Sequence, residues 1–116
     1  MGQVFSSPCF CGPLSLILCG SHSGYFHALS QEGELKWTVE VGDIVNSSPC
    51  FISTQTGTLI ACTANATGKI LMIDCSTGKV LDSIHVEGQI FSSPVLFPPG
   101  YLVVGSRDNF VYCFNF

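Results

Sequence analysis

The stretch "GQIFSSP" at residues 88–94 repeats a stretch near the beginning of the chain, "GQVFSSP" at residues 2–8. A weaker copy, "GDIVNSSP", lies at residues 42–49. The prolines that end the three copies, Pro8, Pro49 and Pro94, are 41 and 45 residues apart. Self-similarity at a nearly fixed period is typical of proteins built from repeated structural units. The sequence therefore predicts three units, at about 2–41, 42–86 and 87–116.

Each unit contains short runs of β-branched and aromatic residues bounded by Gly, Ser, Thr and Asn, which is the pattern of β-strands. No stretch has a helical period. The expected strands lie near residues 7–11, 15–20, 25–29 and 35–41, then 48–53, 58–63, 69–74 and 79–86, then 93–97, 101–105 and 110–115.

Aligning the units places Gly24, Gly68 and Asn109 at one equivalent position. Gly and Asn best tolerate a left-handed backbone, so the same tight turn is expected three times. Two further glycines, Gly33 and Gly78, lie where "HALSQEGELKW" and "MIDCSTGKVLD" are expected to form hairpins.

Four short strands per unit of roughly 40–45 residues indicate blades of an all-β propeller. The strands predict two four-stranded blades and one three-stranded partial blade. Closed propellers use about four to eight blades, so an incomplete ring is expected. The missing outer strand of the last blade is expected to come from the N-terminal end of the full ring and so to close it.

Two stretches resemble the repeat of the PQQ-type (quinoprotein-like) propellers: Asp74-x-x-Thr77-Gly78-Lys79-Val80-Leu81 and Gly33-Glu34-Leu35-Lys36-Trp37. In that family the repeat runs A-L-D-x-x-T-G-x-x-x-W. The resemblance implies that Trp37 docks between neighbouring blades. Asp82 takes the equivalent place in the second unit and implies weaker docking there.

The phrases "GQIFSSPVLF" and "LVVGSRDNFVYCFNF" resemble the C-terminus of the β-alanine-activating enzyme family, which is acyl-CoA-synthetase-like. The resemblance implies that the chain is a propeller segment of an ATP-dependent adenylating enzyme. Its adenylation and carrier motifs are absent from these residues, so no catalysis is expected from this chain.

The quinoprotein resemblance also raises a second reading, a piece of a PQQ-dependent dehydrogenase. Those enzymes usually show adjacent cysteines, whereas Phe10 separates Cys9 from Cys11, and no acidic cluster for calcium is apparent. We therefore expect no cofactor, PQQ included.

Two other chemistries are weighed against strand packing. Cys9, Cys11, Cys19, His22 and His27 lack the Cys-x2–4-Cys spacing of a zinc site, so no metal ligand is expected. The stretch "GSHSG" at residues 20–24 has His22 where a hydrolase elbow has its serine. His27 aligns with Leu71 and Tyr112, as a packing residue would. No catalytic residue is expected.

The Ser-Ser-Pro triplets are expected to begin the innermost strands. Proline lacks an N–H and suits the start of a strand, and the serines are expected to satisfy backbone groups. On the loop at 105–109, Arg107 and Asp108 are expected to form an exposed ion pair.

Composition narrows the partners. With 47% hydrophobic and 10% charged residues, part of the surface is expected to meet other protein, namely the remaining blades of the parent chain or a protein partner. The net charge of −4 with four scattered basic residues argues against nucleic acid. In isolation the open strand edges predict self-association.

No secretory signal is apparent, so a cytoplasmic location with reduced cysteines is expected, and no membrane association. Residues 1–6 also fit the myristoylation pattern M-G-x-x-x-[ST], which leaves a third reading, a lipid-anchored adaptor using Gly2. Because the same letters return at residues 88–94, the repeat explains them without a membrane.

Overall fold

The structure is a computed structural model that describes residues 2–4 and 6–116. Within them the chain forms eleven strands: β1 (Cys9–Cys11), β2 (Leu16–Gly20), β3 (Tyr25–Ser30), β4 (Leu35–Glu40), β5 (Cys50–Ser53), β6 (Leu59–Ala64), β7 (Lys69–Asp74), β8 (Val80–His85), β9 (Val95–Phe97), β10 (Tyr101–Gly105) and β11 (Val111–Asn115). A 3-10 turn, η1 (Gly12–Leu14), joins β1 to β2.

The strands form three antiparallel sheets, each from one continuous stretch of chain. Their orders are β1-β2-β3-β4, β5-β6-β7-β8 and β9-β10-β11. The all-β prediction is confirmed, and every strand begins and ends within two residues of its expected position. Pro8, Pro49 and Pro94 come directly before β1, β5 and β9, so these first strands are shorter than expected.

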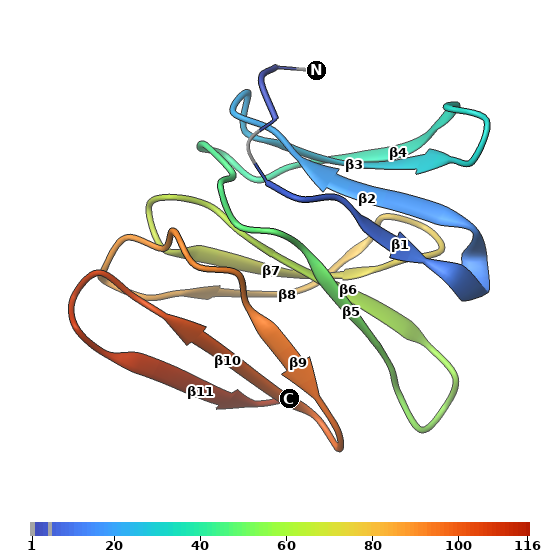
Figure 1. Cartoon of the computed structure of the whole chain (residues 1–116). Helices are drawn as coiled ribbons and strands as arrows, with labels where there is room; N and C mark the ends of the chain where they lie inside the picture. The colour runs from blue at the N-terminus through green and yellow to red at the C-terminus, as the bar shows by residue number, and fades with distance from the viewer. Residues whose placement is uncertain (1, 5) are drawn as a thin grey trace.

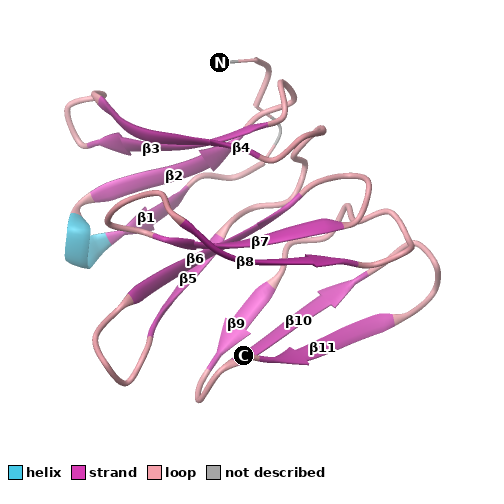
Figure 2. Ribbon diagram, turned by 180° about the vertical axis from the view of Figure 1, so that it is seen from behind, coloured by secondary structure: helices cyan, strands magenta, loops and turns pink. Residues whose placement is uncertain are grey.

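The sheets are stacked face to face in chain order (Figure 1), and the view from behind shows the same stack (Figure 2). The first strands of the second and third sheets, β5 and β9, lie in contact. No helix among the described residues is long and apolar enough to cross a membrane.

Alternation along the strands gives each sheet two apolar faces, and stacking buries them as two cores. The first core lies between the first and second sheets, and its buried members include Leu18, Phe26, Ala61 and Ile73. The second lies between the second and third sheets, and its buried members include Cys62, Ile70, Met72, Leu102 and Val104.

Equivalent residues of the three sheets form the same cross-strand pairs. Leu18 pairs with Ala28 in the first sheet, Cys62 with Met72 in the second, and Val103 with Cys113 in the third. The first two sheets also share a register shift at one equivalent place, between Ala28 and Leu29 and between Met72 and Ile73.

The turn between the second and third strands is the same in all three sheets. Gly24, Gly68 and Asn109 have φ values of 86°, 105° and 73°. Their N–H groups donate to Ser21, Asn65 and Ser106, in each case three residues earlier. A left-handed backbone is required at this place, which explains why only Gly and Asn occupy it.

Candidate interaction site

The three lead-in segments, residues 2–8, 42–49 and 88–94, are each fixed to their own sheet by the first serine of the Ser-Ser-Pro triplet. Each hydroxyl donates to the carbonyl group of the last residue of the sheet's second strand: Ser6 to Gly20 (3.2 Å), Ser47 to Ala64 (2.9 Å) and Ser92 to Gly105 (2.9 Å). These are the residues with which β2, β6 and β10 end. Each serine therefore satisfies a carbonyl at a strand end.

A second contact in each unit joins the lead-in segment to the turn after the second strand. The carbonyl groups of Gln3, Ile44 and Gln89 accept hydrogen bonds from the N–H groups of His22, Ala66 and Arg107. The acceptors and donors differ in side chain but use only backbone atoms. The contact therefore depends on backbone shape, which the repeat conserves within this chain.

The second serine of the triplet connects one sheet to the next. The Ser7 N–H donates to the Ser48 hydroxyl (2.9 Å), and the Ser48 N–H donates to the Ser93 hydroxyl (2.8 Å). We call this chain of contacts through Ser7, Ser48 and Ser93 the serine ladder. Because every rung uses one backbone donor and one side-chain acceptor, the pattern can be extended by any further unit that carries the same triplet.

Trp37 joins the first sheet to the second. Its indole N–H donates to the carbonyl of Cys75 (2.8 Å), and its ring packs against Phe26 at a centroid distance of 5.7 Å. A Cβ atom placed on Gly78 would lie 2.8 Å from the Trp37 ring. The indole therefore packs directly against the backbone of Gly78, which has no side chain to keep it away.

The equivalent residue of the second sheet is Asp82. Trp37 lies opposite Ala28 in the register of the first sheet, and Asp82 lies opposite Met72 in the second. Asp82 is exposed and accepts a hydrogen bond from the N–H of Ser83, its neighbour in the chain. The second interface therefore has no indole anchor at this place.

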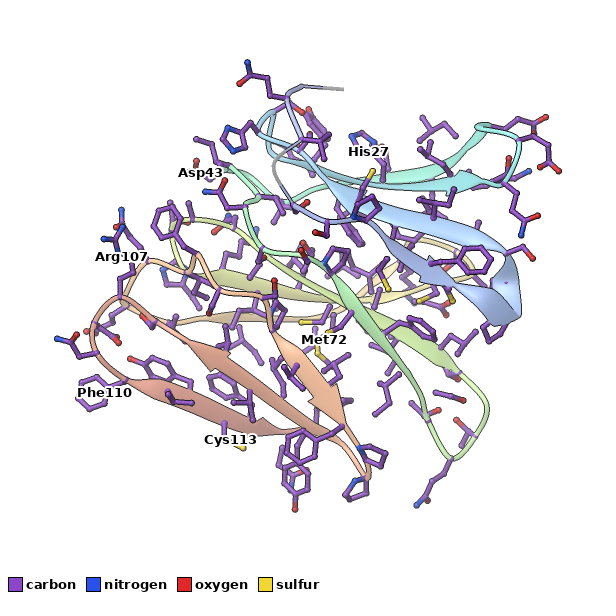
Figure 3. All side chains as sticks on the ribbon, viewed as in Figure 1. His27, Asp43, Met72, Arg107, Phe110 and Cys113 are labelled. Atoms are coloured by element: carbon purple, nitrogen blue, oxygen red, sulfur yellow. The ribbon has the colours of Figure 1, made fainter. Side chains whose placement is uncertain are left out.

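The far face of the third sheet is apolar and largely exposed, with Tyr101 and Val103 half-buried. In the first sheet, the residues at the equivalent positions are covered by the second sheet. In the second sheet, they are covered by the third. The six positions are Val95, Phe97, Tyr101, Val103, Val111 and Cys113. Val111 is 74% exposed. Figure 3 shows Cys113 at the outer side of this sheet and Met72, its equivalent, between two sheets.

The two histidines weighed in the sequence as possible catalytic residues, His22 and His27, have different hydrogen-bond partners. His22 is hydrogen-bonded to the Asn46 side chain (2.6 Å) at the join between the first two units. His27 lies in β3, opposite Cys19, and its Nδ1 is hydrogen-bonded to the Thr38 hydroxyl. Burial lowers the pKa of His27, so its imidazole stays neutral near neutral pH. Its Nε2 is buried and finds no partner among the described residues.

Most of the cysteines lie within β-strands. Cys9 and Cys11 share β1, and Cys11 contacts Cys75 across the first interface. Burial raises the pKa of the Cys75 thiol to about 12 and also raises the pKa of Cys9 and Cys19. Neutral thiols of this kind are weak nucleophiles and weak metal ligands. No group of three His, Cys, Asp or Glu side chains within residues 2–4 and 6–116 is arranged to hold a metal.

Cys50 and Cys62 form a pair that the sequence did not reveal. They face each other in the register of β5 and β6, and the Cys62 thiol is hydrogen-bonded to Cys50. This contact lowers the pKa of Cys50 and raises that of Cys62 well above its usual value. The two cysteines are twelve residues apart in sequence, so only the register of the hairpin could have identified the pair.

The expected ion pair between Arg107 and Asp108 is wrong. The Arg107 guanidinium lies 5.1 Å from the centroid of the Phe91 ring instead. Asp108 accepts hydrogen bonds from the Tyr112 hydroxyl (2.5 Å) and the Phe110 N–H (3.0 Å), which hold its pKa below the usual value. Neighbouring residues in a tight turn point in different directions, so adjacency in sequence does not bring their charges together. Among the described residues the single ion pair is Lys36 with Glu34.

The myristoylation reading falls partly on Met1 and Phe5, which lie outside the described residues. Gly2, which is described, donates its N–H to the Ser23 hydroxyl (3.4 Å). A Cβ atom at Gly2 would lie 3.0 Å from Ser23, and one at Gly88, the equivalent residue, would lie 2.1 Å from the Ser106 hydroxyl. Both glycines thus allow a close approach of the lead-in segment to the turn.

Comparison with solved structures identifies the class of fold. The chain superimposes on BamB from Moraxella catarrhalis, a β-propeller, with a TM-score of 0.75. The match covers 95% of this chain and 31% of BamB at 12% sequence identity. The fold is therefore β-propeller-like, as the repeat predicts. The identity is too low to carry function.

Comparison with curated sequences identifies relatives. The chain is similar to the β-alanine-activating enzymes of Homo sapiens (30% identity, 94% of this chain), Danio rerio (34%, 93%) and Drosophila melanogaster (35%, 72%). It spans about a tenth of the length of each relative. No family model matches the chain. The sequence resemblance to this enzyme is confirmed, whereas the PQQ-type repeat stays a prediction.

Proposed function

We propose that the chain is a non-catalytic β-propeller segment that serves as an interaction or scaffold module of a β-alanine-activating, adenylating enzyme. The serine ladder carries this proposal. It stacks three sheets by contacts that each further unit can repeat, and it uses the most recurrent residues of the sequence for assembly. The three sheets are taken as two complete blades and one partial blade of a larger ring that lies in the cytoplasm.

The chemistry of the described residues supports a structural role. The buried His27 is neutral, the thiol of Cys75 is protonated at neutral pH, and the first serine of each triplet donates to a carbonyl group. The Thr38 hydroxyl is hydrogen-bonded to the His27 imidazole, and we interpret this contact between paired residues of β3 and β4 as packing. The adenylation chemistry of the relatives is assigned to the nine-tenths of their length outside the match.

A chimera tests the scaffold role. The matching tenth of the Danio rerio relative is replaced by this chain, and ATP–pyrophosphate exchange with β-alanine and resistance to proteolysis are measured. We expect exchange within about twofold of the parent and a protease-resistant C-terminal region, because the graft restores the same stack of sheets. A graft that is degraded as fast as one carrying a scrambled insert would refute the proposal.

The isolated chain supplies the second half of the test. With ATP, Mg²⁺ and β-alanine it should give no pyrophosphate exchange above buffer, while the full-length relative serves as positive control. Exchange by the isolated chain would show that catalysis resides in these residues and would overturn the non-catalytic assignment.

A further inference from the structure

Two strands of the second sheet bring a pair of thiols together. Cys50 in β5 lies directly opposite Cys62 in β6. In the first sheet the equivalent pair is Cys9 with Leu18, and in the third it is two valines. Of these three equivalent pairs, only the one in the second sheet has two thiols.

The position of the pair suits a disulfide. Residues directly opposite each other in an antiparallel pair have Cα atoms about 4.5–5.5 Å apart, within the range of about 4.4–6.8 Å that a disulfide bridges. Both side chains lie on the face of the sheet that forms the second core. The Cys62 thiol donates a hydrogen bond to the Cys50 sulfur. The two sulfur atoms can therefore be joined without a change of register.

The surroundings of Cys50 favour its thiolate. Its sulfur accepts hydrogen bonds from the Cys62 thiol and from the Leu96 N–H in β9, which outweigh the effect of burial and lower the pKa of Cys50. Cys62 is fully buried, and its contact with Cys50 and its burial both raise its pKa. Cys50 itself is half-buried, so a small reagent can reach it. The pair thus combines an accessible nucleophile with a buried, protonated thiol.

The other thiols lack this combination. Cys9, at the same place in the first sheet, has a pKa that burial raises. Cys11 and Cys75 contact each other, but both are fully buried, and burial raises the pKa of Cys75 to about 12. Cys113 is exposed, but its partner in β10 is Val103, which has no thiol to react with an oxidised sulfur.

We propose that Cys50 and Cys62 form a reversible disulfide when the chain meets hydrogen peroxide, and that Cys50 is the thiol that reacts first. Disulfides in a reducing compartment are usually transient and belong to catalytic or redox-sensing sites. The inference stands on the contacts of the pair and does not depend on the proposed scaffold role.

The reaction has two steps. The Cys50 thiolate attacks one oxygen atom of the peroxide, so that an S–O bond forms, the O–O bond breaks and hydroxide leaves. The Cys50 sulfur is oxidised to a sulfenic acid, the peroxide is reduced, and the hydroxide takes the proton that Cys50 had released. The Cys62 sulfur then attacks the Cys50 sulfur, and the departing hydroxide takes the Cys62 proton. Two thiols and one peroxide thus give one disulfide and two molecules of water.

Oxidation changes the contact between the second and third sheets. Cys62 no longer has a proton to donate, and the neutral Cys50 sulfur becomes a weaker acceptor for the Leu96 N–H. Leu96 belongs to β9, which lies in contact with β5 across the second interface. The disulfide therefore weakens a hydrogen bond between these two strands.

Peptide mapping of the unmodified chain tests the linkage. The folded chain is treated with hydrogen peroxide, the remaining thiols are alkylated, and chymotrypsin cleavage after Phe51 separates the two cysteines onto different peptides. We expect one intramolecular disulfide, between Cys50 and Cys62, and recovery of both thiols with dithiothreitol. A first disulfide between any other two cysteines, or no disulfide, would overturn the inference.

Three variants test the order of the steps. In Cys62→Ala the sulfenic acid of Cys50 has no thiol opposite it and should be trapped by dimedone. In Cys50→Ser the oxidation of Cys62 should slow by at least about tenfold, because a buried, protonated thiol reacts poorly. The matched control, Cys9→Ser, should form the disulfide within about twofold of the parent rate. Equal rates of Cys62 oxidation in Cys50→Ser and Cys9→Ser would refute Cys50 as the first thiol to react.

Amide hydrogen exchange measures the effect on the interface. The Leu96 amide should exchange at least about threefold faster in the oxidised chain than in the reduced chain, because its acceptor is weakened. Dithiothreitol should restore the slower rate. Equal exchange at Leu96 in both forms would show that the disulfide does not act on the contact between β5 and β9.

Discussion

The two interfaces between the sheets use the same backbone contacts but different side-chain anchors. Both have a rung of the serine ladder, of 2.9 Å at the first interface and 2.8 Å at the second. Trp37 anchors only the first, where it reaches the hairpin that joins β7 to β8. The third sheet has no such hairpin within these residues, and Asp82 occupies the place of the tryptophan. The indole anchor of the first interface therefore contacts a hairpin that has no counterpart among the described residues of the third sheet.

The largest effect is expected from Trp37→Ala. It removes a large ring from the first core and leaves the carbonyl of Cys75 without its donor. We expect a loss of about 3 kcal/mol in the free energy of unfolding, measured by urea denaturation. The matched variant at the second interface, Asp82→Ala, should change stability by less than about 0.5 kcal/mol. Equal losses at both interfaces would remove the distinction between them.

Gly78→Ala should be next. Its backbone has a φ of 78°, and the new Cβ would lie 2.8 Å from the Trp37 ring. Gly33, with a φ of 88° and open space around it, is the control for the backbone alone. We expect Gly33→Ala to cost about 1 kcal/mol and Gly78→Ala about 1–2 kcal/mol more.

A double-mutant cycle separates the two contributions to the effect at Gly78. In the Trp37→Ala background the additional loss should disappear, because the added methyl group no longer meets a ring. An undiminished loss in that background would show that Gly78 does not act through Trp37.

The serines sharpen the comparison within the repeat. The hydroxyls of Ser47 and Ser92 each donate a hydrogen bond of 2.9 Å to the carbonyl at a strand end. Ser47 is only 1% exposed, whereas Ser92 is exposed. Ser47→Ala should therefore cost about 1–1.5 kcal/mol and Ser92→Ala about 0.5 kcal/mol, because water can replace the lost donor only at Ser92. Thermal unfolding of the two variants in parallel measures the difference, and a larger loss at Ser92 would contradict it.

The smallest effect concerns pH. Burial raises the pKa of the Cys75 thiol to about 12, so folding favours its protonated form. Above about pH 9 the unfolded chain loses this proton while the folded chain keeps it, and stability falls as pH rises from about 9 to 12. At about pH 10 the ionisation of Cys75 in the unfolded chain should lower the free energy of unfolding by on the order of 1 kcal/mol.

Cys75→Ala isolates that contribution. The variant is expected to lose less stability than the parent between about pH 8 and about pH 10, measured by urea midpoints. Cys62 lies in the second interface and its pKa is also raised, so some pH dependence should remain in the variant. Identical pH profiles would show that the Cys75 thiol does not couple to folding.

Local sequence signals were sufficient for the strands and turns. The alternation of apolar residues and the recurring Gly24, Gly68 and Asn109 depend on short-range sterics, which every unit must satisfy by itself. The resemblance to a known repeat identified Trp37 as a residue between sheets, and its hydrogen bond to Cys75 lies across the first interface.

The contacts between units were less predictable. The sequence indicated that the serines satisfy backbone groups, but it did not assign the hydroxyl groups of Ser48 and Ser93 to neighbouring units. The pairing of Cys50 with Cys62 depends on hairpin register, and the position of Arg107 depends on the direction of a turn. These features require three-dimensional information because neighbours in space are distant in sequence.

The serine ladder has a consequence for the order of folding. Its rungs join residues 41 and 45 positions apart, whereas each sheet is a series of hairpins between adjacent strands. Closing a long loop costs more entropy than forming a hairpin, so each sheet should form before the rungs that link it to its neighbours. During synthesis the chain would then mature one unit at a time, and each new sheet would find the preceding lead-in serine already in place.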